Sequence, residues 1–413
     1  MAIPDFYRGP AELIVDRISF NYYGGWYSGR GMLQWDPEKG FRLIGFVDRK
    51  TNPLKGYGIG RAGMIRDEDR KTVRLRFQSG EGGVIPRLTL VDRLDVLAGE
   101  RLDVRFPKLH LFRESGFPFT KIVSSGEAVF SGWSGRPYMP DLVRSWKKVG
   151  TGKGLEGWSR SAMQAGDRLG LTLRGELLDT DKTLLHIGWN LKSRMARVGR
   201  VWRWPEAVGY ALTFATGHKI LPVESEVRTK SWSRRTVMMK PKVNPFGIIA
   251  VYETEFLDSN VVAHLAKFFV KDTRESMVAR RILDQLSDAA RQSTWEATEL
   301  LLATILEAAL RTLQNVPFTP HENSKWRADA AVAAFRAKYL DPSWRRTCRD
   351  VLEAWKRLRH RNAHPSWLSD RTRGNAHAKE ALADMALLAR FYGAMILAMS
   401  GWKVEPQIRG PVL

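Results

Sequence analysis

The sequence predicts an α+β protein, with a β-rich N-terminal domain followed by an all-α helical bundle. Up to residue 258, short runs of β-forming residues alternate with glycine, proline and aspartate, and most of the 35 glycines lie there. From residue 259, alanine and leucine dominate, and apolar residues recur with the 3.6-residue period of a helix. The expected parts are therefore domains 1–258 and 259–402, and a C-terminal tail, 403–413.

The N-terminal domain is expected to consist of short strands joined by turns. Trp35–Gly40 separates two runs of β-forming residues within Gly31–Phe46, as the turn of a hairpin does. A stretch rich in glycine and proline, Ser131–Gly157, is a candidate boundary between two subdomains. The other predicted strands include Leu13–Val15, Thr72–Phe77, Leu88–Leu97 and Gly247–Phe256.

The C-terminal domain is expected to be a bundle with short connections. Its predicted helices are 260–270, 274–290, 293–313, 326–340, 343–360 and 376–399. The breaks at Asn315–Pro320, Asp341–Pro342 and Pro365–Gly374 each contain proline, glycine or asparagine, which end helices.

The charge of the chain favours a polyanionic partner. Lysine and arginine number 66 against 44 acidic residues, which gives a formal net charge of +22 over 413 residues. Such a surplus is typical of proteins that bind RNA, DNA or an anionic membrane, although a basic surface can also serve solubility alone. Nucleic acid is the favoured partner.

Cysteine usage and hydropathy favour a cytoplasmic protein without a membrane partner. The single cysteine, Cys348, excludes an internal disulfide framework and a zinc knuckle. The N-terminal residues lack the charged and apolar regions of a signal peptide. The two most apolar segments, Leu300–Leu313 and Ala381–Met399, both carry charges, and no uninterrupted apolar run approaches the ~20 residues that span a bilayer.

The residues most suggestive of chemistry are Arg359 and His364, at the end of a predicted helix that breaks at Pro365. Four residues separate this permanent cation from a titratable imidazole. A base near neutrality can take a proton from the 2′-hydroxyl of RNA, and a cation can stabilise the charge that develops on the phosphate. The pair is therefore a candidate metal-free site for RNA cleavage.

Similar spacings occur elsewhere in this basic chain, which has eight histidines. Arg105 and His110 lie in a predicted strand, Arg371 and His377 begin in a predicted loop, and Arg357 reaches His364 with six intervening residues. Only Arg359 ends a long amphipathic helix with a polar residue directly after it. The alternative is a helix end with surface arginine and histidine side chains.

A second pair of charges lies on the predicted helix at Leu300–Leu313. Glu307 and Arg311 are its only charged residues and lie one turn apart, near the direction of Leu300 and Thr304. They can form an ion pair on one helix face, and burial of either charge alone would cost several kcal/mol. The alternative is a helix whose Glu–Arg face meets solvent.

Together these motifs resemble the HEPN ribonuclease superfamily, over about residues 260–402. That family carries an R-x4-6-H motif and often a Glu-x3-Arg/Lys motif on an earlier helix, which match Arg359/His364 and Glu307/Arg311. The chain looks most like the ApeA-type HEPN proteins of bacterial antiphage defence, whose N-terminal domain opens with a hairpin similar to Gly31–Phe46. The doubled basic run Arg357–Arg361 departs from the family pattern, so either Arg359 or Arg361 faces the phosphate.

The resemblance implies a homodimeric, metal-independent endoribonuclease with no cofactor. Two motifs would face each other across a symmetric cleft and cut RNA, such as tRNA or mRNA, to a 2′,3′-cyclic phosphate and a 5′-hydroxyl. Glu307 and Arg311 would hold the catalytic arginine, and His360 or Asn362 would position the substrate. The N-terminal domain would sense a trigger, for example a phage component, bind RNA or restrain the site.

Two further stretches combine cations with tryptophans. The first is Arg194–Arg203, and the second, Arg228–Lys242, supplies the candidate RNA-binding residues Arg228, Lys230, Trp232, Arg234 and Arg235. Cations bind phosphates and indoles stack on unpaired bases. The alternative is a pair of β-strands with core tryptophans and solvated arginines.

Other classes of site find little support. The histidines do not pair at metal-ligand spacing, so no metal site is expected, and neither a phosphate-binding loop nor a G-x-S-x-G motif occurs. The main competing function is a non-catalytic RNA-binding or scaffold protein on a HEPN bundle. A DNA-binding regulator is a third class, although nothing resembles a recognition helix.

Overall fold

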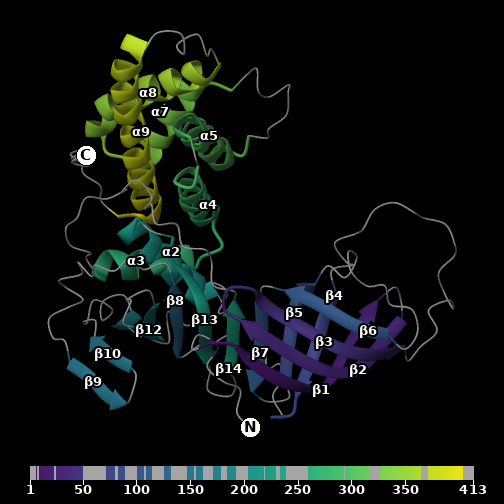
Figure 1. Ribbon diagram of the computed structural model, residues 1–413. Coiled ribbons are helices and arrows are strands. Elements are labelled where there is room, and N and C mark those ends of the chain that lie inside the picture. The colour runs from purple at the N-terminus through teal and green to yellow at the C-terminus, as the bar shows by residue number, and fades with distance from the viewer. Residues whose placement is uncertain are drawn as a thin grey trace, which may run out of the picture. The chain divides into compact units, whose positions relative to one another are not determined.

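The protein forms two compact units that interleave along the sequence (Figure 1). Unit 1 comprises Met1–Ser131, His186–Arg197 and Pro222–Lys242, and unit 2 comprises Gly132–Leu185, Val198–Leu221 and Val243–Leu413. The computed structural model describes residues 6, 9–22, 25–49, 71–79, 82–88, 100–106, 108–113, 125–131, 147–152, 155–160, 171–177, 184–191, 203–217, 219–228, 233–238, 259–292, 294–316, 326–363 and 371–402.

Unit 1 is built from strands that pair in the order β6-β3-β2-β1-β4-β5-β7-β14-β13-β8-β12. Buried side chains from β1 to β7 and from β14 form one apolar core cluster. The strands are β1 Ala11–Tyr22, β2 Gly25–Asp36, β3 Gly40–Arg49, β4 Lys71–Phe77, β5 Gly82–Leu88, β6 Glu100–Phe106, β7 Lys108–Arg113, β8 Ser125–Ser131, β12 Leu184–Leu191, β13 Leu221–Arg228 and β14 Ser233–Met238.

The predicted hairpin at Gly31–Phe46 is confirmed as β2 and β3, which pair antiparallel from Tyr27 with Arg49 to Asp36 with Gly40. The Asp36 carboxylate closes the turn by accepting hydrogen bonds from the backbone N–H groups of Glu38 and Lys39, at 2.9 and 3.0 Å. These bonds lower the pKa of Asp36 below its ordinary value. Gly40 supplies the left-handed backbone, with φ of 79°, that the turn needs.

The other predicted strands have mixed outcomes. Leu13–Val15 lies within β1, and Thr72–Phe77 lies within β4. Leu88 ends β5, whereas the rest of Leu88–Leu97 and all of Gly247–Phe256 lie outside the described residues.

Unit 2 contains one antiparallel set of strands and a helix that the β-rich prediction for residues 1–258 missed. The strands are β9 Lys147–Gly152, β10 Leu155–Arg160 and β11 Leu171–Leu177. The missed helix, α2, spans Trp204–Thr216, has proline in its first turn and ends at Gly217 with φ of 70°. It packs against α3, Ser259–Phe269, and Trp204 is fully buried.

The predicted helices of residues 259–402 are observed with small shifts at their ends. They are α3 Ser259–Phe269, α4 Arg274–Ala289, α5 Trp295–Gln314, α7 Ala328–Tyr339, the short 3-10 helix η6 Pro342–Trp344, α8 Arg345–Ala363 and α9 Arg371–Ser400. The clearest correction concerns Pro365–Gly374, which was predicted as a break but is helical from Arg371.

The long helix α9 packs against α3, α4, α5, α7 and α8. Within the described residues, one segment of it, Lys379–Ser400, is long and apolar enough to cross a membrane, with a mean hydropathy of 1.5. However, 78% of its most apolar stretch is buried inside the protein, as expected of the central helix of a bundle. The coarse α+β class is therefore observed, with antiparallel sheet in the N-terminal half and mostly helices in the C-terminal part.

Candidate functional site

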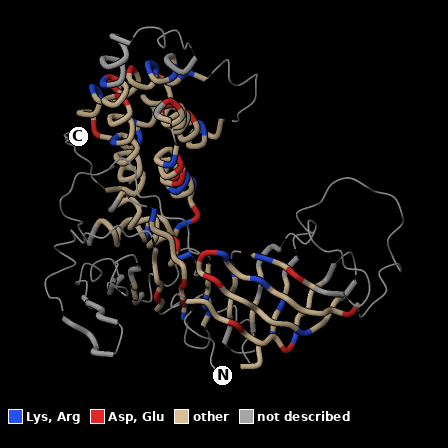
Figure 2. The backbone as a smooth tube through the Cα atoms, viewed as in Figure 1, with Lys and Arg blue, Asp and Glu red and all other residues tan. Residues whose placement is uncertain are grey.

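The candidate site in unit 2 is built from α5 and α8, which pack against each other. α8 buries Cys348, Val351, Ala354, Trp355 and Leu358 at helical spacing. Its other side exposes a row of basic residues, namely Arg345, Arg346, Arg349, Lys356, Arg357, Arg359 and His360. Figure 2 shows the basic positions of this region among the helices of unit 2.

The carboxylate of Glu307 joins two arginines from different helices. Its Oε1 accepts a hydrogen bond from Nε of Arg311 at 2.9 Å, and its Oε2 accepts one from Nη1 of Arg359 at 3.1 Å. The Arg311 side chain is 1% exposed, whereas that of Arg359 is 57% exposed. The alternative in which the Glu–Arg face of α5 simply meets solvent is therefore wrong for Arg311.

Two tryptophans support the same cluster. The guanidinium of Arg311 lies 4.7 Å from the ring centroid of Trp326, and that of Arg359 lies 5.2 Å from the centroid of Trp355. The two rings meet edge to face at 6.4 Å, and Trp355 Nε1 donates to the carbonyl oxygen of Ala303 at 2.9 Å. Cation–π contacts and this anchored indole hold both arginines in place.

Arg359 therefore presents a positioned and largely exposed cation. Its contact with Glu307 uses one of five N–H donors, and no other ion pair of Arg359 is found among the described residues. Donors held in this way are suited to bind an anionic oxygen, such as that of a phosphate.

Arg357, two residues earlier on α8, has a different environment. Its Nε and Nη2 donate to both carboxylate oxygens of Asp384 on α9, at 3.0 and 2.6 Å, and Glu380 lies 3.4 Å away. The hydrogen bonds that Arg357 donates to Asp384 raise the pKa of Arg357. Asp384 is buried, so this bidentate pair fixes α8 to α9.

The remaining predicted site residues are only partly described. His360 is exposed next to Arg359, and α8 continues to Ala363. Arg361 and Asn362 lie in its last turn, with side chains outside the described part. His364 lies outside the described residues, so the expectation that it lies close to Arg359 stays a prediction from the motif.

The other two Arg–His pairs, Arg105/His110 and Arg371/His377, have surroundings that differ from those of Arg359. His110 on β7 is bonded to Thr236 at 2.9 Å, and burial, with help from Arg234 and Lys108, lowers its pKa to about 3. A histidine so rarely protonated is a weak base, and it lies on a strand rather than a helix end. Arg371 and His377 lie in α9 rather than in the predicted loop.

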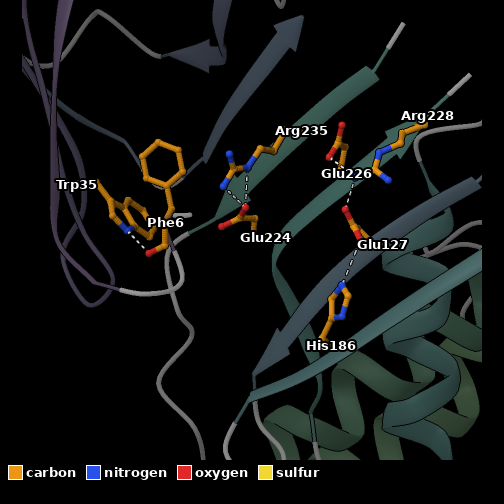
Figure 3. A network of polar contacts seen from close by, with 8 residues as sticks. All are labelled: Phe6, Trp35, Glu127, His186, Glu224, Glu226, Arg228 and Arg235. Atoms are coloured by element: carbon orange, nitrogen blue, oxygen red, sulfur yellow. Dashed lines mark hydrogen bonds and ion pairs between the residues drawn. The ribbon is translucent and has the colours of Figure 1, made fainter. Parts of the chain in front are cut away.

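Two of the candidate RNA-binding residues of unit 1, Arg228 and Arg235, form ion pairs (Figure 3). Arg228 on β13 contacts Glu127 and lies 2.8 Å from Glu226, and Arg235 on β14 donates to Glu224 at 2.6 Å. A phosphate bound by these arginines would have to displace their carboxylates. Arg234 is half-buried, whereas Lys230 and Trp232 lie outside the described residues.

The same network includes His186, whose Nε2 lies 3.4 Å from Glu127. A hydrogen bond with His186 lowers the pKa of Glu127, and the charge of Arg228 adds to this effect. Among the described residues, no group of three or more histidine, cysteine, aspartate or glutamate side chains is placed to hold a metal ion.

Comparisons with known proteins add no assignment. No family model, curated protein or solved structure matches the chain. The functional reading therefore depends on the residues themselves.

Two contributors to the site were missed by sequence reasoning. Trp326 precedes α7 and reaches Arg311 only through the tertiary fold, and Asp384 lies 27 residues after Arg357. A buried aspartate within the apolar pattern of α9 was the available signal for the second contact, because a buried charge needs a partner.

Proposed function

We propose that this chain is a HEPN-type, metal-independent endoribonuclease. The observation that carries the proposal is the Glu307 carboxylate, which is held by buried Arg311 and in turn holds exposed Arg359 near the end of α8. A structural ion pair alone does not require an arginine that is 57% exposed and fixed at the position where the R-x4-H motif begins.

In the proposed mechanism, His364 accepts the proton of the ribose 2′-hydroxyl, and the oxygen attacks the adjacent phosphate. An imidazole with an ordinary pKa of ~6.5 is largely neutral at physiological pH and can act as this base. Arg359 stabilises the developing charge with donors that remain protonated. The requirement for a 2′-hydroxyl restricts cleavage to RNA.

One Arg–His pair provides too few groups to act as both base and acid for the leaving oxygen. A C2 homodimer, in which the second copy supplies a second pair, satisfies this need. The resemblance to antiphage HEPN proteins supports a role in abortive infection in the cytoplasm, with tRNA or mRNA as substrate. Unit 1 would then restrain the site or sense a phage-derived trigger.

The testing experiment incubates purified wild type and His364→Ala with total tRNA and with mRNA in the presence of a chelator. The ends of the products are then mapped. Wild type should leave 2′,3′-cyclic phosphates and 5′-hydroxyls, and His364→Ala should not cleave while remaining a folded dimer. Unchanged cleavage by the variant would refute the assignment.

A non-catalytic RNA-binding or scaffold protein is the second candidate. The ion pair between Arg359 and Glu307 favours it, because the same contact also connects α5 to α8 mechanically. RNA binding by the wild type with no cleavage of any RNA, under conditions that preserve the dimer, would select this function.

A further inference from the structure

The outer face of the first strands of unit 1 carries a row of exposed arginines that ends on an exposed phenylalanine. Arg76 on β4 lies opposite Arg17 on β1, and Arg30 on β2 lies opposite Phe46 on β3. Arg17 lies between the β1–β2 pairs Val15–Gly31 and Ile18–Gly29, so it faces Arg30. With neighbouring strands about 4.8 Å apart, the row crosses four strands and spans roughly 14 Å.

A β-bulge brings Arg17 to this face. Val15 points into the core, so regular alternation would direct Arg17 inward as well. The register of β1 shifts between Val15 and Ile18, and both Asp16 and Arg17 become exposed. Bulges re-aim side chains in this way, and they are over-represented next to active sites as well as at sheet edges.

The three arginines of the row outnumber the two acidic side chains, Asp16 and Asp48, that lie beside them. Among the described residues, Arg17, Arg30 and Arg76 form no ion pair, and all three are exposed. Like charges directly opposite each other destabilise a sheet, as Arg17 and Arg76 do here. The nearby acidic side chains on this face are Asp16 and Asp48, and Glu12 is bonded to Gln34 at 2.8 Å. Stability alone gives no reason for such a row, whereas an anionic ligand does.

The row ends on exposed apolar surface. Phe46, at the end of the row on β3, is 68% exposed. Ile14 on β1, beside the middle of the row, is 58% exposed. The backbone beneath Phe46 is closely packed, because a Cβ atom at Gly45 would lie 2.6 Å from the carbonyl oxygen of Arg30. The largely exposed aromatic ring therefore lies on a closely packed part of the sheet, opposite Arg30.

We propose that this face binds single-stranded nucleic acid, with Arg17, Arg30 and Arg76 on successive phosphates and Phe46 stacked on a base. Proteins that bind single strands combine a cationic track with aromatic stacking platforms. An acidic polypeptide would match the charge but has no planar bases to stack on the ring. The inference is independent of the ribonuclease proposal, because binding here requires neither Arg359 nor a 2′-hydroxyl.

The test measures binding of the full chain to a short fluorescent oligothymidylate by anisotropy. This probe has no 2′-hydroxyl, so failure of the ribonuclease proposal would leave the result unaffected. Arg30→Glu and Phe46→Leu should each weaken binding about ten-fold or more, whereas Phe46→Tyr should retain it because the ring remains. Arg281→Glu, the same charge change at an exposed site on α4, is the matched control and should have a small effect.

Salt dependence gives a second readout. Three phosphate contacts predict a slope of about −2 for the logarithm of the binding constant against that of the salt concentration, and Arg30→Ala should reduce its magnitude by about 0.7. Thermal unfolding, followed by circular dichroism, checks that the variants are folded.

The proposal is overturned if wild type fails to bind the oligothymidylate, or if Arg30→Glu and Phe46→Leu bind it as tightly as Arg281→Glu does. The proposal is also overturned if these variants lose binding to polyglutamate but still bind the oligothymidylate, because the face would then fit an acidic protein.

Discussion

At the scale of single residues, Glu307 matters most, because one carboxylate serves the guanidinium groups of Arg311 and Arg359. Glu307→Ala leaves the buried Arg311 without this carboxylate. We expect the free energy of unfolding to fall by about 3 kcal/mol, since a buried guanidinium loses an ion-pair partner. Urea denaturation followed by tryptophan fluorescence measures this loss.

Glu353→Ala is the matched control for that substitution. Glu353 on α8 pairs with Lys356 at 2.8 Å, but both side chains are more than half exposed. A solvent-exposed pair contributes little to stability, so no measurable loss is expected. Equal losses for the two variants would show that Arg311 does not depend on Glu307.

His110 gives unit 1 a dependence on pH. Burial lowers its pKa in the folded protein to about 3, below the ordinary value of 6.5. Between these values the unfolded chain binds more protons, so the stabilisation is present above pH 6.5 and is lost as the pH falls toward 3. We expect a loss of about 1.5 kcal/mol between pH 6.5 and 5, relative to His110→Gln.

Urea titrations of wild type and His110→Gln at both pH values measure this difference. The variant should show a shallower pH dependence, because glutamine does not titrate. Parallel curves for the two proteins would mean that His110 remains accessible to protons in the folded state.

At the scale of elements, α8 carries two arginines with different tasks. Arg357 neutralises the buried Asp384. Arg359 is exposed and contacts Glu307, which also accepts a hydrogen bond from Arg311. Arg357→Ala should reduce the free energy of unfolding by about 2 kcal/mol, less than for a fully buried pair because Arg357 is half exposed. Arg359→Ala should change it much less. The reverse order in urea denaturation would contradict this division.

The helices and the first hairpin could be predicted because their patterns are local. Apolar periodicity predicted the helix boundaries to within a few residues. Asn315, which ends α5 in a left-handed conformation, marked the end of that helix. The helix α2 was missed although it has Pro205 in its first turn and Gly217 at its end. Its glycines, aromatics and neighbouring strands resemble a β-rich pattern, and its helical state depends on packing against α3.

Part of the candidate site could also be predicted. Glu307 and Arg311 lie one helical turn apart, so their ion pair follows from local geometry. The contacts of Arg359 with Glu307 and of Arg357 with Asp384 connect different helices, and no spacing in the sequence distinguishes the two arginines. The assignment of His364 remains a prediction from the motif.

At the scale of the whole molecule, the proposed chemistry requires two copies of the chain. The activity per chain should therefore fall when the protein is diluted below the dissociation constant of the dimer. Light scattering after size-exclusion chromatography gives the oligomeric state, and RNA cleavage is followed over the same concentrations. Full activity in a solution of monomers would exclude a shared site.

The central claim is that the positioned guanidinium of Arg359 stabilises charge on a phosphate during RNA cleavage. The most direct measurement compares the single-turnover cleavage rates of Arg359→Gln and Arg349→Gln, two variants of exposed arginines on α8. Loss of a donor to the developing charge predicts a rate about 100-fold or more below wild type for Arg359→Gln, and a rate near wild type for Arg349→Gln. Equal rates for the two variants would contradict the claim.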